Sequence, residues 1–273
     1  MKIPFMKMSG SGNDFILIDH RNPFLKEDHL KEFVQKVCRR RVSVGADGLI
    51  LIENSDKADF KWRFFNSDGS EAEMCGNGGR CVARFASLKG ISSSNLTFET
   101  SAGILSAEVK GKRVKLELTQ PHSLKLDGII PIEGNEITFS HINTGVPHTV
   151  LFTQDIERVD VVRLGRMIRY HPLFAPHGTN VNFVRLENGS QISLRTYERG
   201  VEDETLACGT GAVASALVAG FKGLVKSPVS INTRGGEVLT VYFEIEEGEV
   251  KKVFLEGDVH IIYEAEMWEE GYE

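Results

Sequence analysis

An internal repeat is the feature of this sequence that most constrains its fold. The segment CGNGG, which begins at Cys75, reappears as CGTGA at Cys208, an offset of 133 positions (75 to 208). The same offset matches further pairs of residues in similar local contexts: Gly12 with Gly145, Gly45 with Gly178, Glu71 with Glu204, Gly90 with Gly223, Thr100 with Thr233, and Gly103 with Gly236. Because a repeat of this length is too long for a solenoid, it indicates a duplicated domain.

The expected secondary structure repeats together with the motif. Apolar residues have helical spacing at 30–38 and again at 161–168. Strand candidates are 15–19, 49–52, 61–65, 104–109 and 113–118 in the first half, and 148–152, 181–184, 192–197, 238–243 and 253–255 in the second. Short strands on both sides of one buried helix predict an α+β lobe, in which a mostly antiparallel sheet wraps around that helix. We therefore predict two pseudo-symmetric lobes, residues 1–118 and 119–262, followed by residues 263–273.

A helix is predicted directly after each copy of the motif. Residues 212–221 carry no charge, so a helix there should be buried on all sides. Its counterpart, residues 80–88, is largely apolar but keeps Arg80 and Arg84. Both segments are followed by Lys-Gly, at 89–90 and 222–223, a cation and a glycine that are typical of helix C-termini. Each helix should therefore begin at its cysteine.

A cysteine at a helix N-terminus has distinctive chemistry. Unpaired N–H groups and a partial positive charge lower the pKa of a thiol there and bind anions. If the two lobes meet about a pseudo-twofold axis, Cys75 and Cys208 would face each other across a small anionic ligand. Such a pair suits a reaction that removes a proton from one face of a carbon and delivers one to the other. Cys38 and Cys81 lie on apolar helix faces and are predicted to be core residues.

Charge and composition exclude several classes of function. The formal net charge is −6, and five glutamates lie in the last ten residues, so the remainder is nearly neutral. That remainder lacks the positive field of a nucleic-acid binder. No uncharged apolar stretch approaches the about 20 residues of a membrane-spanning helix, and no signal peptide is visible at the N-terminus. Four cysteines without a CxxC pair, and scattered histidines, indicate free thiols in a reducing cytoplasm and no zinc site.

Four segments of the chain resemble the diaminopimelate epimerase family: GSGNDF at 10–15, FFNSDGSEAEMCGNGGRCVARF at 64–85, NTGVPH at 143–148 and YERGVEDETLACGTGA at 197–212. The resemblance spans most of the chain. It implies two α/β lobes, a final strand that returns residues 263–273 to the first lobe, and a homodimer. It also implies interconversion of LL- and meso-diaminopimelate for lysine and peptidoglycan synthesis, without pyridoxal phosphate, metal or any other cofactor.

The same resemblance implies roles for particular residues. Cys75 and Cys208 match the paired acid and base, and His148 and Glu198 match residues that adjust the thiol pKa values. Asparagine amides would hold the substrate's carboxylate and amino groups, the loops after the cysteines would grip the reacting carboxylate, and an arginine would bind a carboxylate in bidentate fashion. The implied substrate-binding residues are Asn13, Asn66, Gly76, Asn77, Asn180, Glu198, Arg199, Gly209 and Thr210.

The sequence departs from the family pattern at two positions, and three of the implied site residues could have a structural role instead. Gly48 stands where some members have Gln, and Val146 where some have Asn, so a side-chain contact to the distal end of the substrate is lost at each position. Asn13 and Asn66 stand beside glycines and could be turn residues instead. His148, which follows a proline, could be a hydrogen-bonded core histidine.

Other functions compete with epimerisation of diaminopimelate. A proline racemase or hydroxyproline epimerase has a similar fold and two cysteines, but does not need the YERG segment or this set of asparagines. A phenazine-type isomerase lacks the paired thiols. A thiol redox protein is disfavoured by the separation of the two cysteines, and an inert amino-acid-binding protein would bind a substrate without exchanging its Cα hydrogen.

Overall fold

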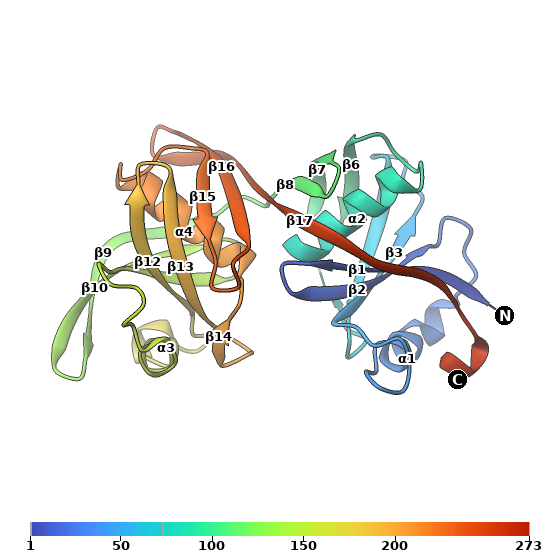
Figure 1. Ribbon diagram of the computed structural model, residues 1–273, viewed down its shortest axis with the longest axis horizontal. Coiled ribbons are helices and arrows are strands. Elements are labelled where there is room, and N and C mark those ends of the chain that lie inside the picture. Colours follow the sequence, from blue (N-terminus) through green and yellow to red (C-terminus); the bar gives the residue numbers. More distant parts are fainter. Residues whose placement is uncertain (1, 73, 273) are drawn as a thin grey trace. The chain divides into compact units, whose positions relative to one another are not determined.

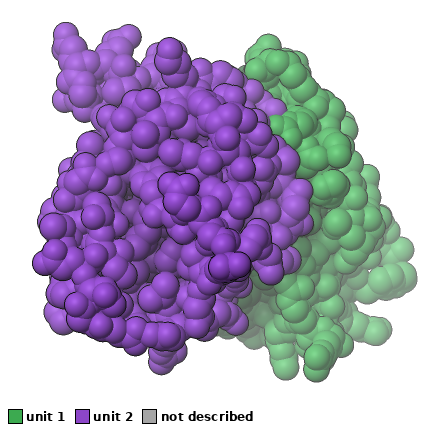
Figure 2. Space-filling model, turned by 60° about the vertical axis from the view of Figure 1, so that its left-hand side comes forward, with its two compact units in different colours: residues 1–117, 257–273 green, residues 118–256 purple. Residues whose placement is uncertain are grey.

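The computed structural model describes residues 2–72 and 74–272 of the chain. They fall into two compact units (Figure 2), unit 1 with residues 1–117 and 257–273, and unit 2 with residues 118–256. The first boundary lies one residue before the predicted one. The return to unit 1 begins at Gly257, six positions before the predicted residue 263, because the last strand, β17 (Glu249–Met267), is continuous and contributes residues to both units.

Unit 1 is a mostly antiparallel sheet around the helix α2 (Gly76–Leu88) (Figure 1). Strand β3 extends the antiparallel hairpin β1–β2 by pairing in parallel with β2, and β3, β4 and β5 then pair antiparallel in that order. Strand β4 also pairs in parallel with β6, and β6, β7 and β8 form an antiparallel meander. A second helix, α1 (Glu27–Val37), buries its apolar side. The strands are β1 (Ile3–Gly10), β2 (Asn13–Asp19), β3 (Gly48–Glu53), β4 (Phe60–Asn66), β5 (Glu71–Ala72), β6 (Asn95–Thr100), β7 (Gly103–Lys110) and β8 (Arg113–Glu117).

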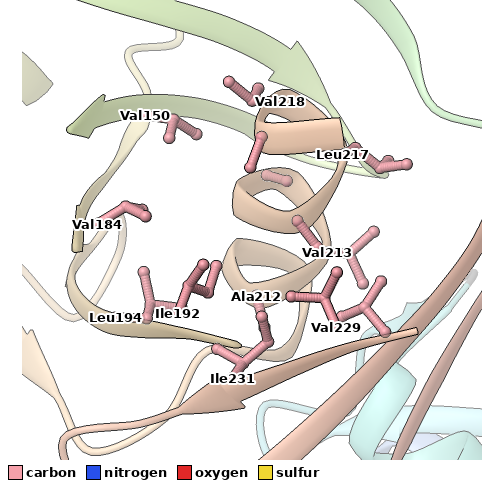
Figure 3. Packing of buried hydrophobic residues seen from close by; sticks show 14 of the residues in the cluster. Val150, Val184, Ile192, Leu194, Ala212, Val213, Leu217, Val218, Val229 and Ile231 are labelled. Carbon is pink, nitrogen blue, oxygen red and sulfur yellow. The ribbon is translucent and has the colours of Figure 1, made fainter. Parts of the chain in front are cut away.

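Unit 2 wraps a second sheet around the helix α4 (Gly209–Phe221). Side chains from the surrounding strands, such as Val150, Val184 and Ile231, pack against α4 (Figure 3). The other helices are α3 (Val161–Arg169) and the short 3-10 helix η1 (Pro172–Phe174); a second 3-10 helix, η2 (Glu269–Gly271), belongs to unit 1. The strands are β9 (His122–Ile132), β10 (Asn135–Asn143), β11 (Pro147–Phe152), β12 (Asn180–Asn188), β13 (Gln191–Glu198), β14 (Asp203–Thr205), β15 (Val229–Asn232) and β16 (Val238–Glu246).

The two units repeat one series of strand pairings. The parallel pairing of β2 with β3 corresponds to that of β11 with β12, and the parallel pairing of β4 with β6 corresponds to that of β13 with β15. The other strand pairs among the described residues of the two units are antiparallel. The predicted fold class, a duplicated α+β lobe with a mostly antiparallel sheet around one helix, is therefore confirmed.

The central helices differ as their sequences predict. Every residue of α4 from Gly211 to Ala219 is buried, in agreement with its uncharged sequence. Helix α2 carries a fully buried Arg80, whose guanidinium donates to Ser11 Oγ at 2.6 Å and to Asn77 Oδ1 at 2.8 Å. A charge inside the first unit is thus accommodated by hydrogen bonds beside the start of the helix.

The hairpin β9–β10 was not among the predicted strands. Leu124 and Leu126 alternate with polar residues, but Gly128 and Pro131 are residue types that disfavour strands, so the strand signal of β9 is interrupted. The glutamate-rich end of the chain, by contrast, forms part of a strand, because residues 259–267 of β17 pair with β1. There Glu266 Oε2 lies 3.4 Å from Lys2 Nζ. Among the described residues, no helix is both long and apolar enough to cross a membrane.

Candidate active site

Cys75 caps the N-terminus of α2 with its own side chain. The backbone N–H of Gly78 donates to Sγ across 3.4 Å. Burial raises the pKa of the Cys75 thiol, and hydrogen bonds from the N–H groups of Gly78 and Asn77 offset part of that rise. The start of the helix therefore supplies donors to a thiolate at this position.

A chain of side-chain hydrogen bonds fixes the loop after Cys75. Asn77 Nδ2 donates to Asn13 Oδ1 at 2.8 Å, and Asn13 Nδ2 donates to Asp47 Oδ2 at 3.0 Å. Asp47 is held in turn by Arg40, whose guanidinium donates to Oδ1 at 2.8 Å. The structure thus brings together Asn13 and Asn77, two of the predicted substrate-binding residues, at the helix start that Gly76 opens.

Asn66 closes the turn that follows β4. Its Nδ2 donates to Ser70 Oγ at 3.1 Å, and its backbone N–H donates to Ser70 O at 2.9 Å. The N–H of Ser67 donates to Asp47 O at 3.1 Å, which joins this turn to the segment that carries Asp47. Asn66 therefore lies next to the hydrogen-bonded chain described above.

The glycine departure at position 48 is explained by local packing. A Cβ atom on Gly48 would lie 2.6 Å from both Phe64 Cε2 and Phe65 O, so a larger side chain does not fit on this backbone. The other departure, Val146, lies in the turn before β11, where its carbonyl accepts a hydrogen bond from the N–H of Thr144 at 3.1 Å.

Cys208 precedes α4 as Cys75 precedes α2, but its surroundings differ. Its side chain makes no capping hydrogen bond, and Sγ lies 3.5 Å from Thr210 Oγ1. Burial raises the pKa of the Cys208 thiol to about 11, and the negative charge of Glu198 contributes to the rise. The hydroxyl of Thr210 and the N–H groups of Gly211 and Thr210 act in the opposite direction.

Glu198 and Arg199 stand at the end of β13, where Asn180 holds the backbone. The N–H of Arg199 donates to Asn180 Oδ1 at 2.8 Å, and Asn180 Nδ2 donates to Pro147 O at 3.0 Å. Burial raises the pKa of Glu198. The loop at Gly209 is joined to this region of unit 2 because Thr144 Oγ1 donates to Thr210 O at 3.1 Å.

His148 is completely buried, and its hydrogen bonding fixes its tautomer. Asn182 Nδ2 lies 3.1 Å from His148 Nδ1 and also donates to Thr149 O, while Asn182 Oδ1 accepts from Thr196. Because the amide nitrogen can only donate, Nδ1 is the acceptor and Nε2 carries the proton. Burial lowers the pKa of His148 to about 3, so the ring is neutral. Among the described residues, its Nε2–H has no hydrogen-bond partner.

Asn182 lies beside the candidate site and was missed in the sequence. A Cβ atom on Gly211 would lie 2.4 Å from Asn182 Oδ1 and 3.3 Å from Cys208 Sγ, so the amide packs against the start of α4 between the thiol and His148. The available signal was the polar–apolar–polar pattern of residues 180–182, which places both asparagines on one face of β12.

The predicted effect of the helix termini on the thiols is outweighed by burial. The N–H groups lower the pKa of each cysteine as expected, but desolvation is the larger effect and raises both pKa values above the ordinary range. Cys38 and Cys81 are buried, as predicted for core residues, and burial raises the pKa of Cys38 to about 12. No group of three His, Cys, Asp or Glu within 2–72 and 74–272 could hold a metal ion.

Solved structures share the fold that carries these two cysteines. A phenazine biosynthesis protein of the PhzF family from Bacillus anthracis superposes with a TM-score of 0.72 at 16% identity, covering 98% of this chain and 99% of that one. A hydroxyproline epimerase from Agrobacterium vitis superposes with a TM-score of 0.70 at 15% identity, covering 99% and 95%. The class is therefore the duplicated α+β fold seen in these proteins.

Sequence similarity identifies the family within that class. The family model for diaminopimelate epimerase matches residues 5–123 and 140–262. The chain is 52% identical to the diaminopimelate epimerase of Aquifex aeolicus, covering 98% of this chain and 99% of that protein, and 45% identical to the one of Archaeoglobus fulgidus, covering 86% and 88%. The chain belongs to the diaminopimelate epimerase family.

Proposed function

We propose that the protein epimerises LL-2,6-diaminopimelate to the meso isomer, without a cofactor, through a two-base mechanism that uses Cys75 and Cys208. The observation that carries this proposal is the repetition of one device: in each unit, a cysteine stands at the N-terminus of the central helix, beside glycine-rich backbone. Membership of the family supports the substrate.

The proposed reaction moves protons only. One cysteine, as the thiolate, takes the proton from Cα, and the other, as the thiol, delivers a proton to the opposite face as the first S–H bond forms. Because the α-proton of an amino acid is a very weak acid, the carboxylate must be stabilised as negative charge moves onto it. Backbone N–H donors at 76–77 and 209–210 are suited to this, and such a donor contributes about 3–4 kcal/mol in other enzymes.

Raised thiol pKa values fit this task. A thiolate whose conjugate acid has a pKa near 11, as at Cys208, is a stronger base toward carbon than an ordinary cysteine thiolate. The cost is a smaller thiolate fraction at neutral pH. Since one thiolate and one thiol are needed together, activity should follow a bell-shaped pH profile that belongs to the pair of cysteines rather than to either one.

His148 and Glu198 are proposed to adjust the thiols in different ways. His148 is neutral with its proton on Nε2, so this nitrogen offers a hydrogen-bond donor and not a base. Glu198 acts through its charge, which raises the pKa of Cys208. Both residues therefore change the energy of a thiolate without taking the substrate proton.

The remaining predicted residues are proposed to bind and orient the substrate. Amides of Asn13, Asn66 and Asn180 would contact its carboxylate and amino groups, together with the loop residues Asn77 and Thr210. Arg199 forms no ion pair with the residues that the structure describes, and its guanidinium suits the distal carboxylate.

The test is exchange of the Cα hydrogen with solvent. LL-diaminopimelate and the purified protein are mixed in deuterated water. The isomers are then separated by chiral chromatography, and their masses are measured by mass spectrometry. In the first turnover, the meso product should carry deuterium at the inverted carbon while the remaining substrate stays protiated, because the donor thiol has already equilibrated with solvent.

The same assay distinguishes the competing functions. Exchange with proline or hydroxyproline instead of diaminopimelate would favour the racemase of that class. Disulfide exchange with a dithiol, without exchange at Cα, would indicate a redox protein, and binding without exchange would indicate an amino-acid-binding protein. Product that keeps its original hydrogen would contradict the two-base mechanism.

A cytoplasmic homodimer is also proposed. Strand β17 exposes three consecutive large apolar side chains, Ile261, Ile262 and Tyr263, with exposed fractions of 40%, 53% and 42%. Adjacent exposed apolar residues are typical of an interaction surface. Light scattering should give twice the mass of 30.3 kDa, and Ile262→Glu should give the monomer mass; a monomer at micromolar concentration would contradict the proposal.

A further inference from the structure

Unit 2 contains a cavity of about 430 Å³ to which no part of the proton-transfer chemistry above is assigned. The volume is within the usual range for small-molecule sites. It lies between the hairpin β9–β10, the helix η1 and the residue that follows β13. The lining residues that matter below are Lys125, Phe139, His141, Phe174 and Arg199.

Three rings form an aromatic cluster in the cavity wall. Phe174 contacts Phe139 edge to face, with ring centroids 5.5 Å apart, and stacks on His141 at 5.6 Å. The neighbouring strand makes room for this cluster, because a Cβ atom on Gly128 would lie 2.7 Å from the ring of Phe139. A flat apolar ligand could stack on such a wall.

The charges in the cavity wall have one sign. Lys125 places Nζ 5.7 Å from the centroid of Phe139, and Arg199 adds a second cation. Among the described residues that line the cavity, none is Asp or Glu. Burial lowers the pKa of His141, and so does the charge of Lys125, so this ring is a neutral aromatic surface near pH 7. The cavity therefore combines an apolar wall with two cations that no lining carboxylate neutralises.

We infer that this cavity binds a small carboxylate with an aromatic body, with the ring against Phe174 and the carboxylate at Lys125 and Arg199. Arg199 is also proposed to hold the distal carboxylate of diaminopimelate. Resting on that proposed function, the inference makes the aromatic carboxylate a competitor of the substrate, because both ligands need the same guanidinium. The cavity would then make the epimerase sensitive to a second class of metabolite.

Calorimetry with phenylacetate tests the site without any turnover. A ligand of this size should bind with a dissociation constant of about 1 mM. The neutral analogue 2-phenylethanol should bind about tenfold more weakly, and the cation phenethylamine more weakly still, because only phenylacetate pairs with the two cations. Equal affinity for phenylacetate and 2-phenylethanol, or no heat with phenylacetate at about 20 mM, would overturn the inference.

Two variants locate the binding. Lys125→Gln should weaken phenylacetate binding about fivefold to tenfold, and Phe174→Leu, which keeps an apolar side chain but removes the ring, by about threefold. Lys226→Gln, an exposed lysine of the same unit outside the cavity, is the matched control and should bind as the parent does. Unchanged affinity in Lys125→Gln would show that phenylacetate binds elsewhere.

Inhibition then tests the link to the reaction. Phenylacetate should raise the KM for LL-diaminopimelate and leave kcat unchanged, and this effect should weaken in Lys125→Gln while that variant keeps its uninhibited rate. Binding without inhibition would overturn the competition but keep the site. If the protein has no epimerase activity at all, the proposed function fails, and the calorimetric result still decides whether the cavity binds aromatic carboxylates.

Discussion

The loops at Cys75 and Cys208 have the same place in the duplicated fold but are held by different interactions. At Cys75, the thiol accepts a hydrogen bond from Gly78, and the following loop is held through Asn77 and Asn13. At Cys208, the thiol makes no capping bond and lies beside Glu198, a carboxyl group whose own pKa is raised by burial. Duplication has thus kept the backbone position of the thiol while its electrostatic surroundings diverged.

This difference suits a reaction in which the two thiols do unlike work in any one direction. A base needs its proton affinity adjusted, and an acid needs a hydrogen bond to its conjugate thiolate. Burial raises both thiol pKa values, but the neighbouring charges differ: Glu198 raises the pKa of Cys208, whereas Arg80 lowers and Asp47 raises that of Cys75. Both cysteines are therefore expected to be necessary for activity, but their thiol pKa values are expected to differ.

The largest expected effect tests whether both Cys75 and Cys208 are necessary for activity. Cys75→Ala and Cys208→Ala should each lower kcat by at least about 10³-fold in both directions, because each face of Cα loses its only proton donor or acceptor. Cys38→Ala, which removes a buried thiol at the end of α1, is the control and should retain most of the activity. Near-normal activity of either catalytic variant, followed by chiral chromatography, would refute the two-base proposal.

The next effect concerns the interactions found only in unit 1. Asp47→Asn keeps the size of the side chain but weakens acceptance of hydrogen bonds from Asn13 and Arg40. Loss of a hydrogen bond to a charged group is worth about 1.5–3 kcal/mol, so kcat/KM should fall by about 10- to 100-fold.

The control for Asp47→Asn is Glu249→Gln, which removes an exposed carboxylate that pairs with Lys251. Steady-state kinetics should show no change in this variant. An Asp47→Asn enzyme with unchanged kcat/KM would mean that the orientation of Asn13 does not depend on Asp47.

The repeat in the sequence was sufficient to predict the two-lobed architecture. Each central helix has a local signal at both ends, a cysteine-glycine start and a Lys-Gly stop, and α4 is apolar on all faces. The hairpin β9–β10 has a weaker signal, because Gly128 and Pro131 interrupt β9 and only its second half buries alternate residues. Its cavity was therefore invisible in the sequence.

From the sequence, site residues could be proposed only where they stand in a motif. Both cysteines stand in a repeated motif, and Asn13 stands in a segment with a clear family resemblance. Asp47 and Asn182 were missed because their roles come from contacts between distant segments: Asp47 bonds to a residue 34 positions away, and Asn182 packs on Gly211. The sign of the thiol pKa shifts was missed for a related reason, since burial is a property of the folded chain.

A smaller effect compares two equivalent glycines. Gly211 and Gly78 each stand three residues after a proposed catalytic cysteine, but an added Cβ at Gly211 would lie 2.4 Å from Asn182 Oδ1, whereas at Gly78 the nearest atom is Ile50 Cδ1 at 3.2 Å. Gly211→Ala should therefore lower the free energy of unfolding by about 1–3 kcal/mol, the usual cost of overpacking. Gly78→Ala should cost less, because the flexible end of an isoleucine can move. Urea denaturation measures both, and equal losses would contradict the difference in packing.

The smallest expected effect isolates the carboxylate of Glu198, whose charge raises the pKa of Cys208 and does not contribute to that of Cys75. The charge of Glu198 raises the pKa of the Cys208 thiol, so Glu198→Gln should lower that pKa below its value of about 11 and increase the thiolate fraction at any pH beneath it. The pH dependence of alkylation by iodoacetamide, measured in a Cys75→Ala background, reports this pKa for Cys208. In the reciprocal Cys208→Ala background, Glu198→Gln should leave the Cys75 profile unchanged, because Glu198 does not contribute to the raised pKa of Cys75. The size of the change should be less than about one pKa unit, since burial is the larger cause and is still present in the variant. A rise in the pKa of Cys208, or an equal fall for both thiols, would show that Glu198 acts by some route other than its charge on the nearer sulfur.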